Sequence, residues 1–227
     1  MVLFGRTLLP SLKNMIQTIQ SQEVSLRYLS DNFGLKLVRD EQFFREWQDD
    51  LPEISDLEKE LLNQVQEGYF NLLEYPPFLE DIVRMAIVDP ILFIGKFFLY
   101  PYHIRSEQSI NLELADKEVI IRGRIDTLVL KENLWVMIIE SKRAEFSIEY
   151  GLAQLLTYLL ASPHVEHPNY GLIVTGGSFI FVKLVKTEIP QYATSKMLAI
   201  RNPGNELFDV LRILKRLSEI ANQEYIH

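Results

Sequence analysis

The stretch that decides the fold runs from Val119 to Lys142 and reads VIIRGRIDTLVLKENLWVMIIESK. It is rich in β-branched and other apolar residues, and the polar tripeptide Lys131-Glu132-Asn133 interrupts it. Such a pattern predicts two strands, Val119–Leu130 and Leu134–Lys142, separated by a turn. Because the connection is so short, we expect the two strands to pair in antiparallel fashion.

Charged side chains are expected to gather on one face of this strand pair, because side chains alternate between the two faces of a strand. Glu140 and Lys142 lie two positions apart at the end of the second strand and therefore point the same way. In the first strand the even positions include Arg122, Arg124 and Asp126, whereas the odd positions are mostly apolar: Ile121, Ile125, Thr127 and Val129. We therefore expect one charged face around Asp126 and one apolar face.

Two carboxylates and an ammonium group at neighbouring strand positions are costly in a protein interior unless they bind something. Asp126 and Glu140, with the main-chain carbonyl of Ser141, would offer the hard oxygen ligands that Mg²⁺ or Mn²⁺ prefers. Lys142 would then position or deprotonate an attacking water, or stabilise the charge of the transition state. The pattern predicts a metal-dependent phosphodiesterase site. The alternative is a surface strand pair in which the three residues form ordinary salt bridges.

A helix is expected directly after these strands, over Ser147–Leu160, and it places Gln154 and Tyr158 one turn apart on the same side. With this helix, Asp126…Glu140-Ser141-Lys142 resembles the core motif of the PD-(D/E)xK nuclease superfamily. The Gln154/Tyr158 pair is similar to the QxxxY element of some of its branches, among them RecB-like nucleases and the N-terminal nuclease domain of type I restriction enzyme motor subunits.

The resemblance covers about residues 109–185, with Ile125 in place of the proline that is common before the aspartate. It implies an α/β, restriction-endonuclease-like fold with a mixed central sheet flanked by helices. It also implies a hydrolase of the nuclease class, an Mg²⁺-dependent endonuclease or exonuclease that acts on DNA. In such a protein Gln154 and Tyr158 would contact DNA or orient the catalytic groups, and both count as catalytic and DNA-binding candidates.

Further candidates surround this core. Arg122 and Arg124 would contact DNA phosphates, or equally would pair with neighbouring carboxylates. In the superfamily a glutamate from an N-terminal helix often completes the metal site. Here the candidates are Glu60, Glu67 and Glu80, of which Glu67 is preferred because it lies deep in a helix beside the apolar stripe.

The remaining elements follow from periodicity and from turn residues. We expect residues 1–100 to be a mostly helical region packed on a nuclease-like core at residues 101–227. Ser55 and Glu58 fit a capping box that opens a helix over Ser55–Glu74, and Pro90 is expected to break the chain. The other expected helices are residues 12–29, 41–47, 78–88 and 205–222, and the other expected strands are residues 109–114, 170–174 and 179–185.

Composition limits what such a site could do alone. The net charge is −8, which predicts weak non-specific affinity for DNA unless a protein partner or a second copy of the chain adds further contacts with the DNA. The absence of cysteine excludes disulfides and thiolate metal sites and fits a reducing cytoplasm, and we expect no membrane association. No Walker A motif is present, so a complete type I restriction motor is excluded. The rival expectation is a non-cleaving accessory subunit, for nucleic-acid binding or protein interaction, in a restriction or repair complex.

Overall fold

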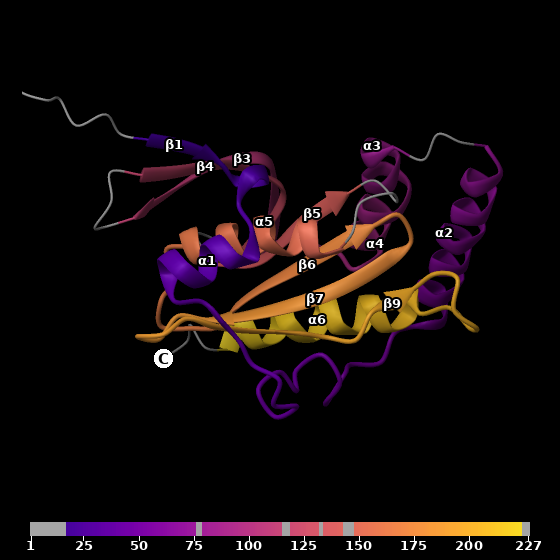
Figure 1. Cartoon of the computed structure of the whole chain (residues 1–227). Helices are drawn as coiled ribbons and strands as arrows, with labels where there is room; N and C mark the ends of the chain where they lie inside the picture. Colours follow the sequence, from indigo (N-terminus) through magenta and orange to yellow (C-terminus); the bar gives the residue numbers. More distant parts are fainter. Residues whose placement is uncertain (1–16, 76–78, 115–118, 132–133, 143–147, 224–227) are drawn as a thin grey trace, which may run out of the picture.

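A computed structural model describes residues 17–75, 79–114, 119–131, 134–142 and 148–223. These residues form a mixed α/β structure around a nine-stranded sheet (Figure 1). Along the sheet the strand order is β1-β4-β5-β6-β7-β8-β2, while β3 pairs with β4 and β9 pairs with β7. The strands are β1 Gln17–Gln20, β2 Lys36–Leu37, β3 Tyr102–Leu114, β4 Val119–Lys131, β5 Leu134–Lys142, β6 Asn169–Thr175, β7 Ser178–Val185, β8 Gln191–Thr194 and β9 Leu198–Ala199.

Helices cover both faces of the sheet and bury a separate apolar core against each face. One core joins α2, η2, α4 and α6 to residues such as Val129 and Ile139. The other joins α1 and α5 to residues such as Ile125 and Leu128. The helical elements are η1 Ser21–Glu23, α1 Leu26–Phe33, α2 Asp56–Glu74, α3 Glu80–Val83, η2 Arg84–Val88, α4 Asp89–Ile94, α5 Ile148–Ala161 and α6 Leu207–Gln223. The predicted α/β class, with a mixed sheet flanked by helices, is confirmed.

The sheet opens beside β4, and this opening positions the candidate site. Strands β4 and β5 pair in antiparallel register, as predicted, but the pairing ends at Thr127 and Ile139. Farther along the same edge, β1 pairs in parallel with Val119–Arg122. Between these two partners, residues 123–126 have no strand partner on this edge within the described part of the chain. We call this opening the strand fork.

At the fork, β4 side chains of the same parity switch from one apolar core to the other. Ile121 and Ile125 pack in the core that contains α5, whereas Val129, of the same parity, packs in the opposite core. Across the hairpin, the regular pairing skips Glu107 and Asp126, between the pairs Ser106–Thr127 and Gln108–Ile125, and Glu107 has a positive φ of 54°. The bend carries the outer half of the hairpin away from β5 and across α5 (Figure 1). The predicted charged face of β4, with Arg124 and Asp126, therefore borders the strand fork.

Several sequence predictions were wrong in the first hundred residues. Of the helix expected over residues 12–29, Gln17–Gln20 is a strand and α1 begins only at Leu26. Residues 12–16 lie outside the described part of the chain. The reason is tertiary: Gln17–Gln20 completes the edge of β4 beyond the fork, and such pairing overrides a local helical pattern. Residues 41–47 form turns rather than a helix.

Pro90 does not break the chain as expected. It stands in the first turn of α4, and α3, η2 and α4 nevertheless follow one another directly. The η2 segment, Arg84–Val88, is a π-helical turn.

Other expectations were confirmed. Ser55 and Glu58 form the predicted reciprocal capping box of α2. A turn at Gly176, with φ 57°, joins β6 to β7. The first hundred residues are not a separate layer, however, because β1 and β2 belong to the central sheet. Strands β8 and β9 were not predicted. Among the described helices none has both the length and the apolar character that crossing a bilayer requires.

Candidate active site at the strand fork

Asp126 is the last residue of β4 before the fork closes onto β5. Its Oδ2 accepts a hydrogen bond from the main-chain amide of Ser141 at 2.9 Å. The carboxylate thus takes the place that a main-chain carbonyl of β4 would hold if the pairing continued. Burial raises the pKa of Asp126, and it outweighs the opposing effects of this hydrogen bond and of the nearby Lys142 ammonium.

Glu140 lies deeper in the site and is fully buried, with 0% of its surface exposed. The Lys142 Nζ lies 2.6 Å from its Oε1 as an ion pair. No other donor among the described residues reaches either carboxylate oxygen. Burial raises the pKa of Glu140 above its ordinary range, and the neighbouring Asp126 carboxylate raises it further against the opposing pull of Lys142.

Lys142 completes the predicted trio. Its side chain is 8% exposed and lies between Glu140 and Glu80, whose Oε1 is 3.8 Å from Nζ. Burial alone would lower the pKa of Lys142, but the charge of Glu140 and the hydrogen bond to it raise that pKa more. The structure therefore holds Lys142 as an ammonium ion at neutral pH.

The N-terminal glutamate that reaches the site is Glu80, on α3, and not the preferred candidate Glu67. Glu60 and Glu67 are exposed on α2, because the buried side of that helix is formed by Leu62, Val65 and Tyr69. Glu80, by contrast, contacts Lys142 and also lines the cavity beside Asp126.

Gln154 and Tyr158 come together as predicted, but both are buried, at 2% and 0% exposure. The Tyr158 hydroxyl donates to the main-chain carbonyl of Arg124 at 2.9 Å. It accepts from Gln154 Nε2 at 2.6 Å and lies 3.1 Å from Ser21 Oγ. With so little exposed surface, these two side chains do not offer the expected direct contact with DNA, which leaves the expectation that they orient other groups.

The hydroxyl of Tyr158 instead donates to the main chain of β4 at the fork, where Arg124 pairs with Ser109 of β3 but has no described strand partner on the opposite edge. Burial is the largest cause that raises the pKa of Tyr158, so the phenol stays protonated and able to donate. The ring lies so close to β4 that a Cβ on Gly123 would stand 2.6 Å from Tyr158 Cε1 and 2.5 Å from Ser21 Oγ. Only glycine fits at position 123.

Arg122 and Arg124 are both exposed on β4. Arg124 Nη1 lies 3.2 Å from Glu107 Oε2, so the carboxylate partner left open by the sequence is present for this residue. Both partners of this ion pair are more than half exposed, which leaves Arg124 able to exchange Glu107 for a phosphate group.

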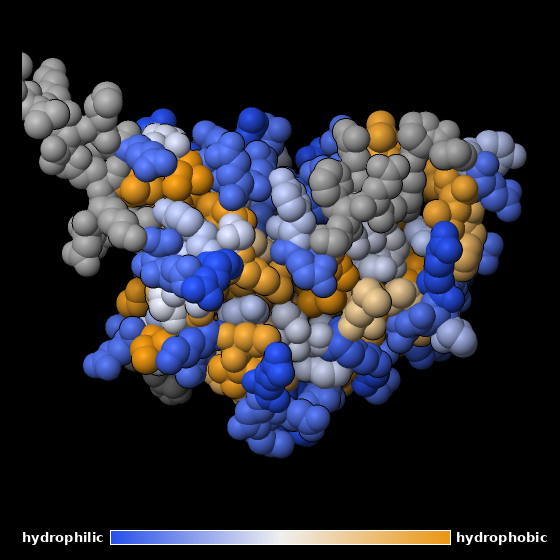
Figure 2. Space-filling view, in the orientation of Figure 1, coloured by the Kyte–Doolittle hydropathy of each residue, from blue (hydrophilic) through white to orange (hydrophobic). Residues whose placement is uncertain are grey.

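A cavity of about 220 Å³ opens onto Asp126 and Ser141 at the fork. In Figure 2 the surface is notched between the hydrophilic face over the β3–β4 hairpin and the face over α3. The remaining lining residues are Gln22, Glu80, Asp81, Arg84, Glu107 and Arg124.

Some of these residues were not found from the sequence. Arg84 could have been, because it follows Glu80 by four positions and therefore shares its helical face. Ser21, Gln22 and Glu107 have no local signal, since only the pairing of β1 and β3 with β4 brings them to the site.

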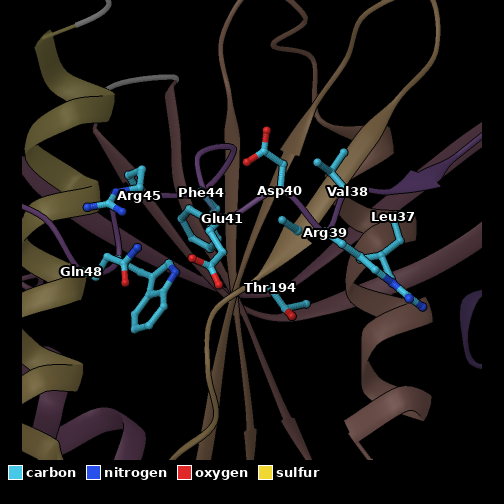
Figure 3. Close-up of a pocket in the computed structure, with 11 residues that line it drawn as sticks. Leu37, Val38, Arg39, Asp40, Glu41, Phe44, Arg45, Gln48 and Thr194 are labelled. Atoms are coloured by element: carbon cyan, nitrogen blue, oxygen red, sulfur yellow. The ribbon is translucent and has the colours of Figure 1, made fainter.

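A larger cavity, of about 580 Å³, lies elsewhere, between residues 37–48 and β8. Figure 3 shows Arg45 and Gln48 on one side of it and Leu37 and Arg39 on the other. Arg45 Nε forms an ion pair with Asp49 Oδ2 at 2.7 Å. None of the predicted site residues lines this cavity. Of the two cavities, the smaller one is thus the one lined by predicted site residues, among them Asp126, Ser141 and Glu80.

No protein-family model matches this chain, and none of the curated proteins compared with it matches either.

Proposed function

We propose that this protein is a metal-dependent nuclease of restriction-endonuclease-like type that hydrolyses DNA phosphodiester bonds. The observation that carries the proposal is Glu140, a carboxylate with no exposed surface and with Lys142 as its sole close partner among the described residues. Leaving a buried carboxylate this poorly satisfied is expensive. A cation bound at the fork would satisfy its free oxygen atoms.

The residues present fit such a cation. Asp126 and Glu140 would hold Mg²⁺ or Mn²⁺ together with the carbonyl of Ser141, all of them hard oxygen donors. Within the described ranges no cluster of three His, Asp or Glu side chains is arranged around a metal position. Mg²⁺ does not need one, because it commonly binds one or two carboxylates and keeps several waters. When bound, it would supply Lewis-acid stabilisation and lower the pKa of a water.

Lys142, 2.6 Å from Glu140 Oε1, would lie beside the metal position and the attacking water. With Glu140 engaged at the metal position, the ammonium group could orient the water and stabilise charge on the phosphate. Glu80, 3.8 Å away, would keep it at the mouth of the fork. Arg84 and Arg124 line the same cavity and would hold the phosphate backbone.

Gln154, Tyr158 and Ser21 would act as positioning residues. They hold the main chain of β4 at Arg124 through the Tyr158 hydroxyl, two residues before Asp126. Their loss would displace the aspartate without removing any group that touches substrate.

The rival proposal is a non-cleaving accessory subunit that binds nucleic acid or protein in a restriction or repair complex. It is favoured by the net charge of −8 and by the acidic residues at the cavity, Glu80, Asp81 and Glu107, which repel phosphate. A protein partner or a homodimer could offset this repulsion.

Cleavage by the purified protein separates the two proposals. Supercoiled plasmid and circular single-stranded DNA would be incubated with Mg²⁺, Mn²⁺ or EDTA, using wild-type protein, Lys142→Ala and Asp126→Asn. A matched control is Lys215→Ala, which removes a lysine that pairs with Glu58 instead. We expect metal-dependent cutting by the wild type and the control alone. Absence of cutting with both metals, or equal cutting by Lys142→Ala, would contradict the nuclease proposal.

A further inference from the structure

A second cavity continues from the fork. Arg84 lines the cavity at Asp126 and also lines a neighbouring cavity of about 370 Å³. The second cavity reaches Thr127, the residue after Asp126, and extends to Phe98 and His103. The other lining residues are Asp89, Ile104 and Ser106. The two cavities share Arg84 as a lining residue and lie between the segment 80–98 and the β3–β4 hairpin, and we call them together the Arg84 groove.

The chain beside this groove presents aromatic rings to solvent. Phe98, which lines it, is 48% exposed, and Tyr100 is 96% exposed. The neighbouring Phe97 is only 2% exposed, so its ring already anchors this segment in the core. Exposing further large rings costs hydration free energy and is typical of surfaces that bind a ligand.

Basic side chains alternate with these rings. Lys96, with φ 66°, precedes Phe98, and His103 and Arg105 follow Tyr100 on the exposed strand β3. Rings flanked by the ammonium group of Lys96 and the guanidinium group of Arg105 match a nucleic acid strand, in which planar bases and phosphates also alternate.

We propose that the Arg84 groove binds single-stranded nucleic acid and leads it to the strand fork. This inference rests on the proposed nuclease function, since it names the form of the substrate. Rings that stack on bases need unpaired bases whose faces are free, which a duplex does not offer.

Charge favours a single strand over a duplex as well. Duplex affinity comes mainly from phosphate contacts, and here Asp89, Glu80, Asp81 and Glu107 oppose the cations of the groove. Stacking on Phe98 and Tyr100 is far less sensitive to these carboxylates. A protein with net charge −8 can therefore hold a single strand through its rings.

The test is fluorescence anisotropy in EDTA, where no cleavage occurs. The probes are labelled oligo-dT and oligo-U of twenty nucleotides and a DNA duplex of the same length, and the proteins are wild type, Phe98→Ala, Phe98→Leu and Tyr100→Ala. Tyr75→Ala is the matched control, because Tyr75 is 71% exposed and caps the end of α2, outside the segment from Lys96 to Arg105 that carries the rings and the basic side chains. Thermal melting of each variant verifies folding, and Tyr100→Ala removes a ring with almost no buried surface.

We expect at least one single-stranded probe to bind more tightly than the duplex. Each of the three groove substitutions should weaken that binding roughly 5- to 100-fold, the loss that one base–aromatic stack gives, while Tyr75→Ala leaves it unchanged. Phe98→Leu should weaken single-strand binding as much as Phe98→Ala, because leucine keeps an apolar contact with the base but cannot stack on it.

Three results would overturn the inference: no single-strand binding, equal or tighter duplex binding, or groove variants that bind like the wild type. A change in oligomeric state alone, seen by light scattering for Phe98→Ala and Tyr100→Ala, would mark the surface as a protein interface and also overturn it. Plasmid cleavage by groove variants would leave the nuclease proposal standing. Single-strand binding without any cleavage would contradict the nuclease proposal but would still support the Arg84 groove as a binding site for single strands.

Discussion

The lysine–glutamate pairs Lys142–Glu140 and Lys183–Glu46 both have little exposed surface, and their carboxylates are satisfied very differently. Lys183 pairs with Glu46, donates to the carbonyl of Phe43 at 2.9 Å and lies over the Phe43 ring. Tyr170 donates a second hydrogen bond to Glu46 Oε1, so a single oxygen of that carboxylate, Oε2, lacks a donor.

At the fork, Lys142 faces Glu140 with no such support, and both oxygens of Glu140 lack any donor other than Lys142 among the described residues. The first pair fastens residues 43–46 to β7. The second leaves unsatisfied groups of the kind that a ligand completes. Burial is common to both pairs, whereas the number of donors that reach the carboxylate differs: Lys183 and Tyr170 reach Glu46, and Lys142 alone among the described residues reaches Glu140.

The largest expected effect comes from the functional pair. Lys142→Ala should lower the rate of metal-dependent DNA cleavage by about 10²–10³-fold, the cost of removing one group that stabilises developing charge. Initial rates on plasmid, at saturating Mg²⁺, measure it. Lys183→Ala, assayed below its melting temperature, should keep at least half of the wild-type rate, and equal losses in both variants would erase the distinction.

The structural pair should show the opposite behaviour. Lys183→Ala removes the partner of Glu46 and the donor to Phe43, so the free energy of unfolding should fall by about 2–3 kcal/mol, somewhat less than for a fully enclosed pair. Urea denaturation followed by circular dichroism measures it. A loss below about 0.5 kcal/mol would mean that this pair, too, is unimportant for folding.

Tyr158→Phe tests the support of the fork. The substitution keeps the ring but leaves the Arg124 carbonyl and the Gln154 amide without the hydroxyl, which should cost about 1–3 kcal/mol of stability. We expect cleavage to fall as well, because Asp126 follows two residues later on β4. Tyr102→Phe, which removes a hydroxyl that bonds Ser218, is the control. Unchanged stability with Tyr158→Phe would count against a positioning role.

The smallest effect is a gain in stability. Burial holds the folded-state pKa of Asp126 above its unfolded value of about 3.9, so the folded state binds the proton more tightly. Stability from this group is complete below the unfolded pKa and is lost as the pH rises through the folded pKa. Asp126→Asn removes that penalty, because an amide oxygen can still accept from Ser141.

We therefore expect Asp126→Asn to be more stable than the wild type by about 1 kcal/mol at pH 7, with the difference vanishing near pH 4. Added Mn²⁺ should raise the melting temperature of the wild type and leave that of Asp126→Asn unchanged. Melting curves across this pH range, with and without the ion, measure both. A variant less stable than the wild type at pH 7 would show that the carboxylate contributes to the fold.

The sequence was informative where local pattern and tertiary structure agree. Alternation placed Asp126, Glu140 and Lys142 correctly on two antiparallel strands, because a strand with one apolar face can pair in a single register. The four-residue spacing placed Gln154 beside Tyr158. The capping box fixed the start of α2.

It failed where a residue acts through a distant partner. Nothing near Tyr158 in the chain indicates that its hydroxyl bonds Arg124, 34 positions away, or that Ser21, 137 positions away, approaches it. The choice of Glu80 over Glu67 depends on which side of α2 is buried and on the π-helical turn after α3. Neither follows from periodicity alone, since both glutamates lie on amphipathic segments.

The missing side chain at Gly123 has a mechanical consequence. With no Cβ on β4 at this point, the flat ring of Tyr158 lies directly against the strand and sets how closely β4 can approach α5. An aromatic ring has a fixed thickness and only two rotatable bonds, so it hardly compresses. The main chain of β4 three residues before Asp126 is therefore held firmly against α5, and an ion bound at the proposed site would meet an aspartate that needs little rearrangement.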